Sequence, residues 1–131
     1  MSRREIREHV IKMLYCSGFH EEQDMEEQIS MYIDKVLMTV SQRDYFIKRY
    51  KEVKEKLSQI DEIISEKSVG WSIARMAKID LNILRLAVYE IKFDDSIPVK
   101  VSIDEAVEIA KVYGGDSSPS FINGILAKVL D

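Results

Sequence analysis

Arginines and a tyrosine share one flank of the first predicted helix, over residues 3–17. At about 100° per residue, Arg4, Arg7 and Tyr15 fall together about 120° around from the apolar face. Guanidinium groups bind phosphate oxygens with paired hydrogen bonds, and an aromatic ring can stack on an unpaired base. This flank, with Arg3 in the first turn, is a candidate contact for single-stranded RNA. The alternative is a solvated helix face whose arginines pair with neighbouring glutamates.

A second candidate lies inside the last predicted helix, where Asn123 is followed by Gly124. An alanine in place of the glycine would stabilise a helix by about 0.5–1 kcal/mol, so packing alone does not explain the pair. The loop before this helix begins with Gly114-Gly115, which ends the preceding helix, and Ser118-Pro119 supplies a cap and a first-turn proline. We therefore expect a site near Asn123.

The sequence contains no pattern typical of catalysis or of metal binding. His9 and His20 have no cysteine or carboxylate partners at metal-ligand spacing, and Cys16 has no neighbouring hallmark of a nucleophile. Phosphate-binding glycine loops and the G-x-S-x-G nucleophile motif are both absent. We expect no enzyme activity, no cofactor and no metal.

The composition is that of one globular domain. Of the 131 residues, 46% are hydrophobic and 32% are charged, and the net charge is −4. The single cysteine, the missing signal peptide and the missing membrane-length apolar stretch predict a cytoplasmic protein. The charge is unevenly distributed, because residues 1–18 and 43–56 are net basic whereas residues 20–34 carry six acids and no lysine or arginine.

Apolar residues recur at helical spacing and alternation is nearly absent, so an all-α fold is predicted. Capping signals are Ser2 with Glu5, Ser41 with Asp44, Ser102 with Glu105, Ser118, and Asp80. The helices expected before the last pair cover residues 3–17, 24–40, 43–65, a short stretch to about 77, and 81–93.

A break at Ser68–Ser72 divides the single domain, residues 1–131, into subdomains 1–67 and 68–131. Trp71, which lies in this break, is expected to pack in the core. Arg75 and Arg85 lie near apolar helices and are expected to be paired.

Several motifs together resemble the NusB family, the bacterial transcription antitermination factors. They are the R-R-E-I-R-E opening, W-S at 71–72, I-D-x-x-I-L-R-L-A-x-Y-E from Ile79 to Glu90, I-P-V-K-V from Ile97, I-D-E-A-V-E-I-A-K from Ile103 to Lys111, and F-I-N-G-I-L from Phe121 to Leu126. Residues 20–65 are similar only in helical character. The family commonly has an acid at the position of Ser117, whereas this chain has its acid one place earlier, at Asp116.

The resemblance implies a compact bundle of about seven helices in two subdomains, without catalysis. It implies that the chain binds boxA-type nascent RNA together with the ribosomal protein NusE, and helps RNA polymerase pass terminators, notably in ribosomal RNA operons. By position it implies that Asp80 binds the partner. The residues that it implies for RNA binding are Arg3, Arg4, Arg7, Tyr15, Ser117, Ser118, Phe121 and Asn123.

Two other readings stay open. Domains similar to NusB also occur in ribosomal RNA cytosine methyltransferases, and this chain would then be a fragment without its cofactor-binding domain. A helical domain that binds only protein is the third possibility, and a salt-dependent RNA affinity would separate it from the first.

Overall fold

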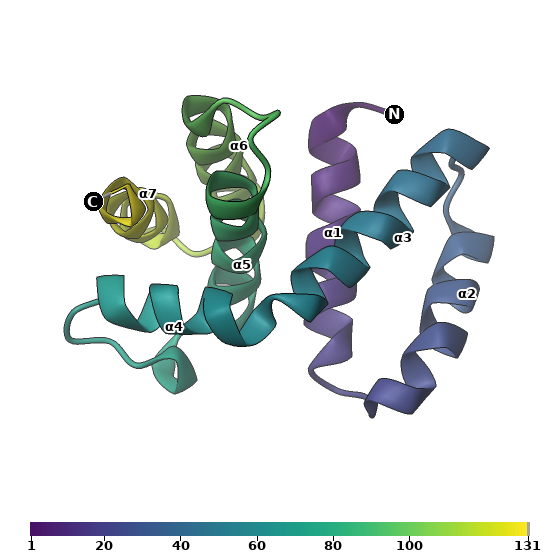
Figure 1. The fold of residues 1–131 in the computed structure, drawn as a ribbon, viewed down its shortest axis with the longest axis horizontal. Helices are drawn as coiled ribbons and strands as arrows, with labels where there is room; N and C mark the ends of the chain where they lie inside the picture. Colours follow the sequence, from purple (N-terminus) through teal and green to yellow (C-terminus); the bar gives the residue numbers. More distant parts are fainter. Residues whose placement is uncertain (131) are drawn as a thin grey trace. The chain divides into compact units, whose positions relative to one another are not determined.

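The computed structural model describes residues 1–130, and every regular element in that range is helical (Figure 1). The prediction of an all-α fold is confirmed. None of these helices is both long and apolar enough to cross a membrane. Two short 3₁₀ turns, Glu22–Asp24 and Ile73–Arg75, accompany the α-helices, which are α1 (Arg3–Ser17), α2 (Met25–Lys35), α3 (Val40–Glu55), α4 (Leu57–Lys67), α5 (Lys78–Phe93), α6 (Val99–Tyr113) and α7 (Ser118–Val129).

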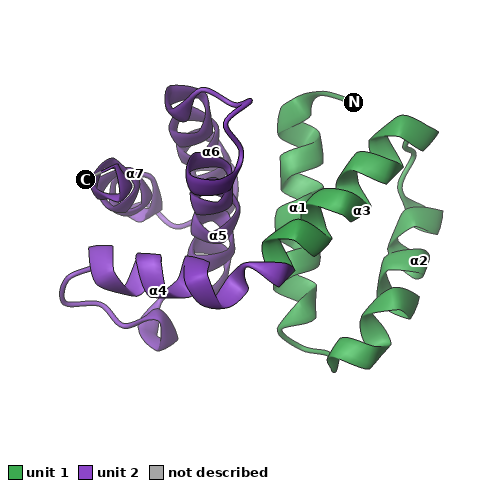
Figure 2. Ribbon diagram, in the orientation of Figure 1, with its two compact units in different colours: residues 1–54 green, residues 55–131 purple. Residues whose placement is uncertain are grey.

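The chain divides into two compact units, residues 1–54 and 55–131 (Figure 2). The sequence placed the division at 67/68, where the structure has a turn inside the second unit. The reason for the difference is the packing of α4, which lies against α5 and α7. Ile60 and Ile64 on α4 are completely buried, so this helix belongs with the C-terminal helices.

In the first unit, α1 has the bounds and caps expected from the sequence. The Ser2 hydroxyl accepts a hydrogen bond from the Glu5 N–H at 3.1 Å, and the Ser2 N–H donates to Glu5 Oε1 at 3.0 Å. These bonds from Ser2 hold the pKa of the Glu5 carboxyl below its ordinary value. Gly18 ends the helix.

The second and third helices differ from the sequence prediction. The helix expected over residues 24–40 ends at Lys35, because Val36 is extended. The next helix is capped by Thr39 and Gln42 rather than by Ser41 and Asp44: the Thr39 N–H donates to Gln42 Oε1 at 3.0 Å, and the Gln42 N–H donates to Thr39 Oγ1 at 3.1 Å. The pair Thr-x-x-Gln fits the capping pattern better, since glutamine reaches back to the cap more easily than the shorter aspartate.

The helix predicted over residues 43–65 is two helices, α3 and α4. The chain leaves helical geometry at Lys56, where φ is −98° and ψ is 9°. The apolar stripe continues across the break, from Val53 on α3 to Ile60 on α4, and both side chains are completely buried. The helical spacing of apolar residues therefore continues through Lys56, although the backbone is not helical at that residue.

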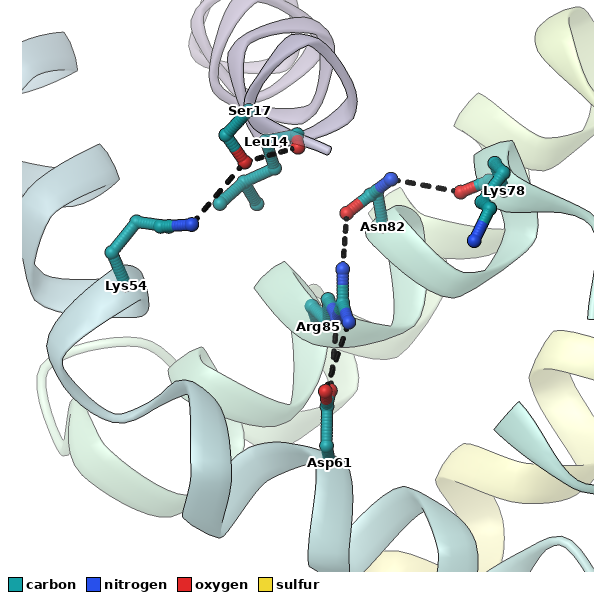
Figure 3. A network of polar contacts seen from close by, with 7 residues as sticks. All are labelled: Leu14, Ser17, Lys54, Asp61, Lys78, Asn82 and Arg85. Carbon is teal, nitrogen blue, oxygen red and sulfur yellow. Dashed lines mark hydrogen bonds and ion pairs between the residues drawn. The ribbon is translucent and has the colours of Figure 1, made fainter. Parts of the chain in front are cut away.

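Helix α5 is the central element of the second unit, and α4, α6 and α7 all pack against it. Every residue from Asp80 to Glu90 is buried except Arg85, which is half-buried. The Arg85 guanidinium donates two hydrogen bonds to the Asp61 carboxylate on α4, at 2.9 and 2.8 Å, and a third to Asn82 Oδ1 at 3.1 Å (Figure 3). The expected pairing is confirmed for Arg85 and is wrong for Arg75, which is exposed and lies against the Trp71 ring.

Three helix starts in this unit differ from the predicted caps. Helix α5 begins at Lys78, so Asp80 lies in its first turn and not at the cap. Helix α6 begins at Val99, which places Ser102 inside it, where the hydroxyl donates to the buried Glu90 carboxylate at 2.7 Å. Ser118 is the first residue of α7 and not its cap.

We expect Asp61→Asn to lower the free energy of unfolding by about 1.5–3 kcal/mol, because it removes the charge from a bidentate, partly buried pair. Urea unfolding measures the change. Asp104→Asn is the matched control, since the Lys100–Asp104 pair is exposed, and it should change the stability by less than about 0.5 kcal/mol. Equal losses in the two variants would contradict the assigned role of the Arg85–Asp61 pair.

Candidate nucleic-acid interface

The arginines of α1 lie on a flank that borders its buried residues, since Ile11 lies between Arg4 and Arg7 around the helix and is 2% exposed. Arg3 and Arg4 are exposed and Arg7 is half-buried, whereas Ile6 and Val10 are buried. The capping box at the start of the helix fixes the first turn, which carries two of these arginines. The assignment of this flank to RNA binding stays a prediction, for which the structure supplies the exposure of Arg3 and Arg4.

His9 anchors the opposite side of α1. Its Nδ1 lies 2.5 Å from the Tyr32 hydroxyl on α2, and the Tyr32 ring stacks on Phe46 of α3 at 5.6 Å. Burial lowers the pKa of the His9 imidazole, which favours the neutral form. His9 thus holds the rotation of α1 without adding charge, and this rotation turns the arginine flank away from α2.

Tyr15 is 40% exposed and pairs with Phe19, whose ring centroid is 5.3 Å away. Phe19 is 66% exposed and follows Gly18, the end of the helix. Phe19 was not among the residues predicted from the sequence, although an aromatic residue directly after a helix-ending glycine is a recognisable signal. The two rings extend the arginine flank with an aromatic surface suited to stacking.

The loop before α7 is shaped by Ser118. Its hydroxyl accepts a hydrogen bond from the Gly115 N–H at 3.0 Å, and the residue is 4% exposed. A Cβ at Gly114 would lie 2.5 Å from the Ser118 Cβ, so only glycine fits there. Ser118, which the sequence predicts as an RNA-binding residue, therefore positions the loop. The neighbouring Ser117 is exposed.

The surface of α7 carries the other candidates. Phe121 is half-buried, and Asn123 and Gly124 are exposed. A Cβ added at Gly124 would meet nothing within 4 Å, so the fold does not require glycine at this position. Phe121 and Gly124 are three residues apart and lie on the same face of the helix. A ligand could approach the backbone closely beside an aromatic ring at this point.

Trp71 departs from its expected place in the core. It is 49% exposed, and its ring meets Phe121 edge-on with centroids 6.1 Å apart. Phe121 is thus next to a tryptophan that was not predicted to lie near it.

Asp80, the candidate partner contact, is only 8% exposed in the first turn of α5. Its Oδ1 is buried and accepts no hydrogen bond from the residues that the structure describes. A negative charge is favourable near a helix N-terminus, which offsets part of the cost of burial. The exposed neighbours at this helix start are Ala77 and Lys78.

The candidate residues fall into two sets, one in each compact unit. Arg3, Arg4, Arg7 and Tyr15 belong to the first unit, and Ser117, Phe121 and Asn123 belong to the second. Within residues 1–130, no group of three or more histidine, cysteine or acidic side chains is placed to hold a metal ion. The first set offers positive charge and an aromatic ring, and the second offers an aromatic ring, polar side chains and, at Gly124, open backbone. Each of these can contribute to binding a nucleic acid.

Comparison with known proteins gives consistent matches over the chain. The model of the NusB family matches residues 4–131. The chain is 54% identical to the transcription antitermination protein NusB of Lachnoclostridium phytofermentans, over 100% of both proteins. The solved structure of T. maritima NusB is 38% identical with a TM-score of 0.88, over 98% of this chain and 90% of that one. In a structure of the antitermination factors NusB and NusE with dsRNA, a chain 22% identical has a TM-score of 0.81, over 97% of this chain and 94% of that one, which shows a common fold.

We expect Gly124→Ala to raise the free energy of unfolding by about 0.5–1 kcal/mol, because the new methyl group meets open space in an exposed helix. Gly114→Ala is the contrasting control and should destabilise the protein, because its methyl group would clash with Ser118. Urea unfolding of both variants measures the two signs. A loss of stability in Gly124→Ala would mean that the fold itself requires this glycine.

Proposed function

The chain belongs to the NusB family, and from this premise we propose that it is an RNA-binding adaptor in transcription antitermination. It binds boxA-type single-stranded RNA together with the ribosomal protein NusE, and the complex helps RNA polymerase read through terminators, notably in ribosomal RNA operons. It acts in the cytoplasm, by binding and not by catalysis. The observation that carries the proposal is the arginine flank of α1, turned away from α2 by the His9–Tyr32 contact.

The names of the relatives and the contents of one neighbouring structure support this role. The relative in Lachnoclostridium phytofermentans is a transcription antitermination protein, and one structural neighbour was solved with NusE and dsRNA. The candidate residues supply the matching chemistry, since arginines bind phosphates and aromatic rings stack on bases.

On α1, Arg3, Arg4 and Arg7 bind the phosphate backbone, and Tyr15 with Phe19 stacks on bases. Contacts to phosphate position the RNA but do not read its sequence. Selectivity therefore depends on the second set, where Phe121 and Asn123 offer a ring and an amide that can hydrogen-bond to base edges. Ser118 acts by holding the loop, and Ser117 stands exposed beside it.

The partner contact is proposed at the start of α5. The Asp80 Oδ1 is buried within the unit, and the 8% of Asp80 that is exposed is the part that a hydrogen-bond donor of a partner would contact. A charge-assisted hydrogen bond contributes about 1.5–3 kcal/mol, so a few additional contacts supplied by NusE would raise the affinity of the complex for RNA by orders of magnitude.

We expect Arg7→Ala to weaken RNA binding by about 1–3 kcal/mol while the protein stays folded, because one phosphate contact is lost. Fluorescence anisotropy with labelled boxA-type RNA, alone and with NusE, measures the affinity at several salt concentrations. The slope of log K against log salt should fall in magnitude by about 0.7 for a single-stranded ligand.

Arg43→Ala is the matched control, because Arg43 is also a half-buried arginine of the first unit but lies on α3. It should leave the affinity nearly unchanged. An unchanged affinity of Arg7→Ala at low salt, or equal losses in both variants, would contradict the assignment of the α1 flank.

We expect Asp80→Asn to weaken NusE binding by about 1.5–3 kcal/mol and to leave RNA binding by the isolated chain unchanged. Asparagine keeps the shape of this mostly buried side chain, so the fold is preserved better than by a lysine. Calorimetric titration with NusE measures the loss, and Asp104→Asn, an exposed carboxylate on α6, is the control. Equal effects on NusE and RNA binding would argue against separate surfaces.

A further inference from the structure

Trp71 is held by a tight turn that keeps half of its surface exposed. The Trp71 N–H donates to the Ser68 carbonyl, and the Ser68 hydroxyl donates to the Trp71 carbonyl, both at 3.0 Å. Gly70 has a φ of 87°, a conformation that residues with side chains rarely adopt. A glycine and a buried serine thus fix this backbone, yet the ring that it carries is 49% exposed.

Two neighbouring side chains orient the indole. The Phe121 ring on α7 meets it edge-on at 74°, and the Arg75 Cζ lies 5.6 Å from the indole centroid. Within residues 1–130, Arg75 forms no ion pair with a carboxylate, so its positive charge is not neutralised by a neighbour in that range. Trp71, Arg75 and Phe121 all belong to the second compact unit.

We propose that Trp71 and Arg75 form a nucleotide-binding pair that extends the α7 surface. The exposed part of the indole stacks on one unpaired base, and the guanidinium of Arg75 binds the phosphate of that or the next nucleotide. Phe121 connects the pair with Gly124, which lies on the same face of α7. This inference rests on the proposed RNA-binding function and adds a contact to it.

The chemistry of the pair favours a nucleotide over a protein side chain. An apolar side chain of a protein would cover the indole but would leave the charge of Arg75 uncompensated. A nucleotide satisfies both groups at once, because it presents an apolar π-face and a phosphate a few ångströms apart. Tryptophan is also the side chain whose ring gives the strongest cation–π contact, which keeps Arg75 beside it.

Trp71 is the only tryptophan of the chain, so its fluorescence reports on this position alone. We expect boxA-type RNA to quench the Trp71 emission saturably, with the same midpoint as an anisotropy titration of labelled RNA. The titration uses the full chain with NusE bound, and each signal is corrected for the emission of NusE alone. An emission that stays constant while anisotropy reports binding would overturn the proposal.

The variants separate stacking from charge. Trp71→Leu should weaken RNA binding by about 5- to 150-fold, the range expected for loss of one stacked base, whereas Trp71→Phe should retain most of the affinity. Arg75→Gln should weaken binding and lower the salt dependence, and Arg75→Lys should restore the salt dependence. Val69→Ala is the control, because Val69 is an exposed apolar residue of the same turn and should bind as the native chain does. Thermal unfolding checks that every variant is folded.

The outcomes distinguish this inference from the proposed function. If the native chain binds RNA and Trp71→Leu binds it equally well, the Trp71–Arg75 pair is not a nucleotide site and the adaptor function stands. If Trp71→Leu weakens NusE binding but not RNA binding, the pair belongs to the protein partner and the inference is wrong. If neither the native chain nor its NusE complex binds RNA, both the function and the inference fail.

Discussion

Burial of α5 along most of its length is the constraint on which the second unit depends. A helix that is buried on nearly all sides has little solvent to satisfy its polar side chains, so partners inside the protein are favoured. The Asp80 Oδ1, which accepts no hydrogen bond from residues 1–130, is the exception described above. Arg85 donates hydrogen bonds to Asp61 on α4, and Glu90 accepts one from the hydroxyl of Ser102 on α6. The Asn82 amide donates to the Lys78 carbonyl one turn earlier in the same helix. These bonds give α4 and α6 defined positions along α5, which apolar packing alone does not specify.

The same constraint determines where the candidate binding residues lie. Because α4 is tied to α5 through Asp61 and also packs on α7, the turn that follows α4 is held within the second unit. Trp71 on this turn then meets Phe121 on α7. The loop before α7 is closed by the Ser118 hydroxyl and by the close approach of Gly114, so Phe121 and Asn123 are carried by a helix with a defined start.

Several surface features are not explained by stability. Gly124 stands in an exposed helix where alanine would be more favourable, and Trp71 keeps half of its indole in water. Arginines in the first turn of α1 lie at the positive end of the helix dipole, which is unfavourable for a positive charge. A surface that binds RNA gives each of these features a reason, since it needs positive charge, flat rings and access to the backbone. The folding core and the proposed binding surface are therefore separate sets of residues that share the same helices.

Local signals in the sequence determined the all-α class, the full extent of α1 from Ser2 to Gly18, and the end of α6 at Gly114, because these depend on residues within one helical turn. Helical spacing supplied the candidate residues of α1, and the Asn-Gly pair indicated a site near Asn123. The resemblance to a family added Ser117, Ser118, Phe121 and Asp80. Tertiary structure alone decided that Ser102 binds Glu90 instead of capping a helix, that Asp80 is mostly buried, and that Trp71 is half-exposed. A serine hydroxyl can cap its own helix or satisfy a buried carboxylate twelve residues away, and the local pattern is the same in both cases. The hydrogen bond that Ser102 donates to the buried Glu90 carboxylate depends on packing between helices, and its free energy favours the second arrangement.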